Sequence, residues 1–504
     1  MKKDNLHRII AKGAGITLLG ILISKLLGYI YRLIVARLGP DAYGELSLGL
    51  AVFGILSVIS VLGLNFGVLR YISVYKSKNE ENNVRGTIKF SMKLVFLSSV
   101  VISFFAFIFS DWISNVLFHT DKISLIIKII VIALPFESLR SIVMNTFMSF
   151  KNIEYDLYSR IIVENVLKIF LTLIFISLGL SVISAVIAYT LSIVLSAIVG
   201  LYLLEKKVFS FLKRLSVNFV YKKEIFLYSL PLIFYSLTAM IMSWTDSLML
   251  GYFKTTSDVG IYNAAVPTAR LVGIVPLALI SLYIPVMSSL LENKDQLKKI
   301  FYITTKWIIL VNTLFLSLMI IFSKNILGIL FGNEYVIGYS SLIVLGVGHF
   351  IYGFVYTSRD TLMVLKKTKF IFFSTLLAFF LNVILNYLLI PKYGILGASI
   401  ATTIALIFGG LILFLKTLKE TKIMILDWRI LKIFLIGLVS SVVGYFLISK
   451  LSINNQIMFV IIGGIIVSSL YLILLYLLRI FQEEDFELLD LIKKRLGIKH
   501  EKNK

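Results

Sequence analysis

Long apolar stretches separated by short polar segments dominate the pattern of this chain. A helix that crosses a bilayer needs about 20 mostly apolar residues, and fourteen stretches of this kind can be marked in the sequence. They lie at about 14–36, 43–68, 92–110, 125–149, 158–178, 182–203, 227–251, 260–289, 302–322, 337–361, 370–390, 395–415, 430–449 and 457–478. The pattern predicts an all-α polytopic membrane protein with about 14 transmembrane helices.

The basic residues gather on one side of this predicted topology. Of the 50 Lys and Arg residues, 36 fall at the N-terminus, at the C-terminus and in alternate loops, 6 in the opposite loops and 8 inside the stretches. Because Lys and Arg favour cytoplasmic loops, we expect a multi-pass protein of the cytoplasmic membrane with both termini cytoplasmic. The net charge of +23 is therefore mainly a topology signal, and a charged fraction of only 15% disfavours a nucleic-acid partner.

The residue types that many catalytic and metal sites need are scarce. The chain has no cysteine and only four histidines, which excludes disulfides, thiolate ligands and cysteine nucleophiles. No phosphate-binding Gly-rich motif that ends in Gly-Lys-Ser/Thr occurs. We expect no catalytic residues, no bound metal and no cofactor, with Na⁺ or H⁺ as open alternatives for a coupling ion.

Two weak internal matches suggest repeated halves. The segment at 40–46 resembles the one at 256–262, and 183–188 resembles 396–401, at nearly the same offset. Six helices per half give both halves the same topology. The predicted organisation is an N-terminal lobe of helices 1–6 (1–204), a cytoplasmic linker (205–226), a C-terminal lobe of helices 7–12 (227–416), helices 13–14 (417–480) and a charged, amphipathic cytoplasmic tail (481–504).

Ionisable side chains inside spans are costly and usually mark a wet cavity. Ordinary explanations compete with that reading. Lys128, Lys306 and the Arg359–Asp360 pair lie near predicted helix ends, where side chains can reach the interface. Glu164 and Lys168 are four residues apart and Glu137 and Arg140 three apart, so each pair can neutralise itself on one helix face.

The remaining charges are candidates for binding. Lys25 and Arg32 are seven residues apart, so they share a helix face, and neither has a nearby acid. The excess of cations predicts an anionic ligand such as a phosphate or diphosphate. The predicted cavity cations are Lys25, Arg32, Arg270 and Arg140, and the predicted ion-coupling or counter-ion residues are Asp246, Glu137 and Glu164.

Three motifs resemble the polysaccharide-transporter branch of the multidrug/oligosaccharidyl-lipid/polysaccharide (MOP) exporter superfamily. The first, at 381–398, reads LNVILNYLLIPKYGILGA and is similar to that branch's LNxxLNxxLIPxxGxxGA signature. The second joins DSLMLGYF at 246–253 to VGIYNAA at 259–265. The third runs from IVARLG at 34–39 into Tyr43-Gly44. The resemblance covers roughly the first twelve spans.

The resemblance implies a MATE/MOP-like fold of two six-helix lobes plus two C-terminal helices, which transports by alternating access. It further implies a Wzx-like flippase whose cargo is a polyprenyl-(di)phosphate-linked oligosaccharide, with membrane lipids and glycan-assembly enzymes as partners. Related lipid II flippases have a similar first helix, Ser-Arg-x-Leu-Gly-x-x-Arg-Asp. Here Lys25 keeps the first cation, while Tyr31-Arg32 replaces the Arg-Asp pair, which favours another lipid-linked oligosaccharide.

Other functions compete with the flippase. A cation-coupled drug or metabolite exporter of the same fold needs acidic cavity residues, whereas the spans hold 8 basic and 4 acidic residues. A lipid II-type flippase is a further alternative. A membrane glycosyltransferase ranks low because the longest predicted outward loops have only about 15 residues. A scaffold that only recruits assembly enzymes stays open.

Overall fold

The structure is a computed structural model, and every regular element that it describes is a helix. It describes residues 20, 23–213, 221–273, 283–284, 286–288, 290, 293–422, 428–451 and 453–482. Nine helices in these ranges are long and apolar enough to cross a membrane. The all-α membrane fold is confirmed, while the count of fourteen stays a prediction. Most of the predicted tail at 481–504, including its amphipathic segment, lies outside the described residues.

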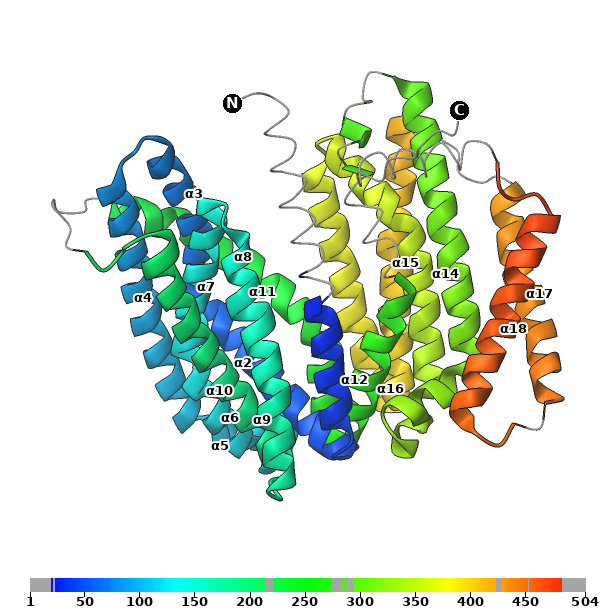
Figure 1. The fold of residues 1–504 in the computed structure, drawn as a ribbon, viewed down its shortest axis with the longest axis horizontal. Coiled ribbons are helices and arrows are strands. Elements are labelled where there is room, and N and C mark those ends of the chain that lie inside the picture. The colour runs from blue at the N-terminus through cyan, green and yellow to red at the C-terminus, as the bar shows by residue number, and fades with distance from the viewer. Residues whose placement is uncertain are drawn as a thin grey trace, which may run out of the picture. The chain divides into compact units, whose positions relative to one another are not determined.

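Contacts divide the chain into two compact units, Met1–Asn263 and Ala264–Lys504. The first unit begins with a helix over residues 23–36. Its further elements are α2 (Pro40–Val61), α3 (Leu64–Ser77), α4 (Glu81–Ile108), α5 (Ser110–Phe118), α6 (Lys122–Ile130), η1 (Val131–Ala133), α7 (Leu134–Phe150), α8 (Ile153–Asp156), the π-helix η2 (Leu157–Glu164), α9 (Asn165–Ser177), α10 (Val182–Leu203), the π-helix η3 (Leu204–Val208), α11 (Lys222–Phe253) and the start of α12 (Thr256–Ala269) (Figure 1).

The second unit carries the remaining helices among the described residues. They are the end of α12, η4 (Arg270–Gly273), α14 (Lys294–Leu330), η5 (Asn333–Gly338), α15 (Tyr339–Val364), α16 (Thr368–Thr421), α17 (Trp428–Ser449) and α18 (Gln456–Leu477). Within α16, Gly394 has a φ of 55° and breaks the helical path three residues after Pro391. That break separates the predicted spans at 370–390 and 395–415.

The first unit continues past the predicted linker. Helix α11, which the sequence places in the C-terminal lobe, packs against α2 and α3. At this contact the side-chain oxygen of Ser229 lies only 2.3 Å from the place where a Cβ on Gly67 would be. The lobe boundary at 205–226 itself stays a prediction.

The two segments of the first sequence repeat meet where α2 and α12 begin. A Cβ on Gly44 would lie 1.8 Å from the carbonyl oxygen of Thr256, and one on Gly260 would lie 2.0 Å from that of Pro40. The Asp41 carboxylate accepts a hydrogen bond from the Thr256 hydroxyl at 2.8 Å. Only glycine allows backbones to approach this closely, so the repeated Gly44 and Gly260 are explained by a mutual contact.

We expect Gly44→Ala to destabilise the first unit by about 1–3 kcal/mol or more, because the added methyl group meets backbone that cannot rotate away. The thermal midpoint of the purified protein in detergent measures the effect. Gly464→Ala in α18 is the matched control, since a Cβ there meets nothing within 4 Å. Equal midpoints for the two variants would contradict the close contact.

Candidate functional site

The first unit contains a cavity of about 320 Å³. Its walls come from the helix over 23–36 and from α2, α7, α9, α10 and α11. The charged side chains that line it are Arg32, Lys168 and Glu137. Five aromatic side chains complete much of the wall: Tyr31, Tyr43, Phe53, Tyr189 and Trp244. The cavity therefore combines cations with flat apolar surfaces.

Lys168 is a cation of the cavity wall that is only 6% exposed. Its ammonium group donates to the Asn165 amide oxygen at 3.1 Å and lies 3.5 Å from a Glu164 carboxylate oxygen. It also lies 5.0 Å and 5.3 Å from the ring centres of Tyr31 and Tyr189. A buried ammonium needs such partners because water does not solvate it. The same contacts hold the ammonium group in place at the cavity wall.

Arg140 joins two carboxylates that lie on different helices. Its Nε donates to Glu137 Oε2 at 2.9 Å, and a second nitrogen donates to Glu164. The local pairs predicted from spacing, Glu137–Arg140 and Glu164–Lys168, are both confirmed. Arg140 links them into one buried cluster, defined here as Glu137, Arg140, Glu164 and Lys168. Glu137 and Lys168 line the cavity, whereas Arg140 is not among its lining residues.

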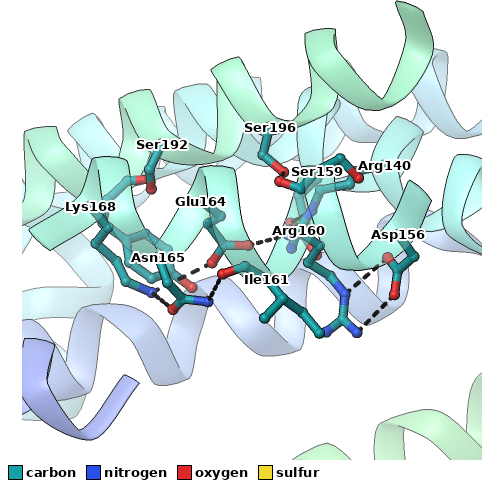
Figure 2. A network of polar contacts seen from close by, with 12 residues as sticks. Arg140, Asp156, Ser159, Arg160, Ile161, Glu164, Asn165, Lys168, Ser192 and Ser196 are labelled. Carbon is teal, nitrogen blue, oxygen red and sulfur yellow. Dashed lines mark hydrogen bonds and ion pairs between the residues drawn. The ribbon is translucent and has the colours of Figure 1, made fainter. Parts of the chain in front are cut away.

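An irregular helical segment positions this cluster. Residues Leu157–Glu164 form a π-helix that passes into α9 at Asn165. Figure 2 shows how side chains support it: Asn165 donates to the Ile161 carbonyl at 2.9 Å, and Ser196 of α10 donates to the Ser159 carbonyl at 2.8 Å. π-Helical turns are rare and recur at functional sites. Here the π-helix ends at Glu164, the carboxylate that contacts both cations.

The two predicted cations of the first helix have different environments. Arg32 lines the cavity beside the Tyr43 hydroxyl, which donates to the Asn263 carbonyl at 3.2 Å. Lys25, two turns earlier, is exposed in the described structure. The shared helix face was predictable, but the structure brings only Arg32 to this cavity.

The other predicted site residues lie elsewhere. Asp246 in α11 accepts a hydrogen bond from the Tyr262 hydroxyl at 2.6 Å. Arg270 opens η4 in the second unit and lies near His349 of α15. Among the described residues, no group of three or more His, Asp or Glu side chains is placed to hold a metal ion.

The interpretation that end-of-span charges reach the interface is wrong for Lys306. Its side chain is 1% exposed, and its ammonium group donates to the Ile480 carbonyl at 3.3 Å. Asp360 is also fully buried and pairs with Arg359 at 3.0 Å. Lys128 is partly exposed and bonds Asp111 at 2.9 Å. Lys306 and Lys128 thus have partners distant in the sequence, which local spacing does not reveal, whereas Asp360 pairs with its neighbour Arg359.

Lys168 is the cavity residue that sequence reasoning missed. Its spacing from Glu164 explained it as half of a local pair, and the pair exists. A cation shared between a carboxylate and two aromatic rings from other helices still presents charge to a cavity. Local spacing could not predict these ring contacts, because Tyr31 and Tyr189 lie far from Lys168 in the sequence.

The fold is similar to that of solved multi-pass membrane transporters. A lipid II flippase in an inward closed conformation matches 90% of this chain and 97% of its own, with a TM-score of 0.71 and 17% identity. An inward-facing multidrug resistance MATE family transporter of the MOP superfamily matches 79% of this chain and 94% of its own, with a TM-score of 0.64 and 15% identity.

The sequence identifies the family within that fold. Residues 10–291, more than half of the chain, match the family described as "Polysaccharide biosynthesis protein", and the chain belongs to it. Residues 231–388 also match the MatE family. The predicted membership of the MOP superfamily and of its polysaccharide branch is confirmed.

Relatives extend over most of the chain. A membrane protein of Methanocaldococcus jannaschii is 26% identical and covers 96% of this chain and 98% of its own. A putative O-antigen transporter of Shigella flexneri is 25% identical over 77% of this chain and 91% of its own. A probable low-salt glycan biosynthesis flippase of Haloferax volcanii is 28% identical over 37% of this chain and 40% of its own.

We expect Arg140→Met to lower the free energy of unfolding by about 3–5 kcal/mol, because breaking a buried ion pair leaves carboxylates uncompensated. Chemical denaturation in detergent measures the loss. Lys128→Gln is the control: the side chain of its partner Asp111 is 64% exposed, so the loss should stay below about 1 kcal/mol.

The variant that combines Arg140→Met with Glu137→Gln separates charge from packing. It should recover most of the lost stability, because Glu164 keeps Lys168 as its cation and no buried charge is left without a partner. A double variant as unstable as Arg140→Met alone would contradict the electrostatic explanation.

Proposed function

We propose that this protein is a flippase that moves a polyprenyl-(di)phosphate-linked oligosaccharide across the cytoplasmic membrane by alternating access. The product would serve cell-surface polysaccharide or glycoprotein glycan assembly. The observation that carries the proposal is the cavity in which Arg32 and Lys168 share a wall with five aromatic side chains. The names of the O-antigen and glycan relatives support the same cargo class.

The cavity chemistry fits a phosphate group attached to sugar. A guanidinium group binds phosphate oxygens through paired hydrogen bonds, and an ammonium group adds a point charge. Aromatic rings offer flat apolar faces with a polar edge. In this proposal Arg32 and Lys168 bind the phosphate, and the aromatic wall packs against the apolar faces of a neighbouring sugar ring.

The buried cluster would hold Lys168 ready for an anion. Glu164 and Asn165 fix its ammonium group, and Arg140 fixes Glu164. We assign Arg140 a positioning role rather than contact with phosphate. Lys25 and Arg270 stay proposed contacts in other states of the transport cycle.

We further propose that the N- and C-termini are cytoplasmic, on the basis of the asymmetry of basic residues. Membrane lipids surround the protein in this arrangement, and glycan-assembly enzymes would supply and use the cargo. Na⁺ or H⁺ would couple transport through Asp246, Glu137 or Glu164. Asp246 lies within reach of the Tyr262 hydroxyl, which offers a second oxygen to a cation.

A cation-coupled multidrug or metabolite exporter is the second candidate, and the MatE match over residues 231–388 favours it. The cavity of the first unit disfavours a cationic cargo, because its wall carries two cations and one carboxylate. A lipid II-type cargo is a narrower form of the first proposal.

Reconstituted in liposomes, the wild type should move a fluorescent lipid-linked oligosaccharide between leaflets. We expect Lys168→Gln and Arg32→Gln each to slow this movement by about 10- to 100-fold, because each removes a charge-assisted hydrogen bond to phosphate. Lys93→Gln, which removes an exposed charge on α4, is the control and should transport normally.

Two results would overturn the proposal. One is a wild-type protein that moves none of several lipid-linked oligosaccharides. The other is transport of cationic drugs that survives Lys168→Gln and Arg32→Gln, which would identify the exporter instead.

A further inference from the structure

The segment that follows α10 carries an unusual exposed surface. Lys206, Lys207 and Lys213 are exposed, and between them Leu212 is 66% exposed. Tyr202, in the last turn of α10, is also exposed. Lysines beside an exposed apolar side chain are the combination that favours an anionic membrane surface.

This segment is held in place from its interior. Phe211 is buried in the core of the first unit together with Leu204. The Arg85 guanidinium lies 5.2 Å from the ring centre of Phe209, and its Nε donates to the Ser210 carbonyl at 3.2 Å. The exposed residues therefore project from an anchored loop.

Side-chain hydrogen bonds to the backbone hold the exposed Leu212 in position. The Lys89 ammonium donates to the carbonyls of Leu212 and Lys213 at 3.2 Å and 2.7 Å. The Leu212 amide donates to a Glu205 carboxylate oxygen at 3.0 Å. Residues 202–213 contain three lysines and one acid, Glu205, so the segment has a net positive charge.

The length of the preceding helix sets the depth of this surface. Residues Val182–Val208, whose apolar part ends at Leu204, form a continuous helix of 27 residues. At about 1.5 Å per residue this is roughly 40 Å, enough to cross the hydrocarbon core and reach the headgroups on the far side. Tyr202 lies one turn before the lysines, and tyrosine favours the membrane–water interface.

We propose that Lys206, Lys207, Leu212 and Lys213 form an interfacial anchor that binds anionic phospholipid headgroups at the membrane surface where α10 ends. The lysines bind headgroup phosphates, and Leu212 inserts at the boundary with the acyl chains. The partner is the surrounding bilayer, so this surface differs from the cavity and does not depend on the proposed cargo.

Depth labelling tests the insertion of Leu212. Because the chain has no cysteine, Leu212→Cys places a single thiol for an environment-sensitive fluorophore. In vesicles with anionic phosphatidylglycerol, a quencher on the shallow acyl carbons should quench this label. Ser77→Cys, at an exposed position at the end of α3, is the water-facing control. Equal quenching of the two labels would overturn the insertion.

Charge variants test the headgroup contact. The test variant combines Lys206→Gln, Lys207→Gln and Lys213→Gln. At low ionic strength, its preferential retention of phosphatidylglycerol over phosphatidylcholine should fall by roughly fivefold for each lysine removed. A control triple of Lys369→Gln, Lys419→Gln and Lys422→Gln removes the same charge from exposed lysines of the second unit. Equal losses in both triples, or binding of an acidic soluble protein with no lipid preference, would overturn the proposal.

Discussion

A charge that is buried among membrane-length helices needs a partner inside the protein, and the buried cluster of Glu137, Arg140, Glu164 and Lys168 satisfies this constraint. Two carboxylates and two cations neutralise one another within it. The cluster also ties α7 to the π-helix and α9. Breaking these ion pairs would lower the free energy of unfolding, so the cluster stabilises the wall of the cavity.

The balanced cluster is compatible with the anionic cargo that we propose. The four charges of the cluster cancel, so Arg32 makes the charged residues in and next to the cavity wall net positive. In the proposed flippase, a phosphate that approaches Lys168 would compete with Glu164 for the same ammonium group. The phosphate would then replace a carboxylate as the partner of Lys168, so this exchange would cost little electrostatic energy.

Much of this arrangement follows from helix periodicity alone. The pairs Glu137–Arg140 and Glu164–Lys168 were predictable because residues three and four apart share a helix face. The Arg140–Glu164 bond was not, since it joins helices whose contact depends on packing. Similarly, seven-residue spacing puts Lys25 and Arg32 on one face but does not say that only Arg32 lies against the cavity.

The repeat at Gly44 and Gly260 shows the opposite case, in which a weak sequence signal had a direct physical origin. Each glycine lacks a Cβ where the other segment's backbone passes, so both positions are constrained by one contact. A match of a few residues can therefore carry structural information when it reflects mutual packing rather than local conformation. Two tyrosines of the same segments, which do not occupy equivalent positions, add hydrogen bonds around this contact. The Tyr43 hydroxyl donates to the Asn263 carbonyl of α12, and the Tyr262 hydroxyl donates to the Asp246 carboxylate of α11. Tyr262 therefore joins the α2–α12 contact to Asp246, and Tyr43 joins it to the cavity wall.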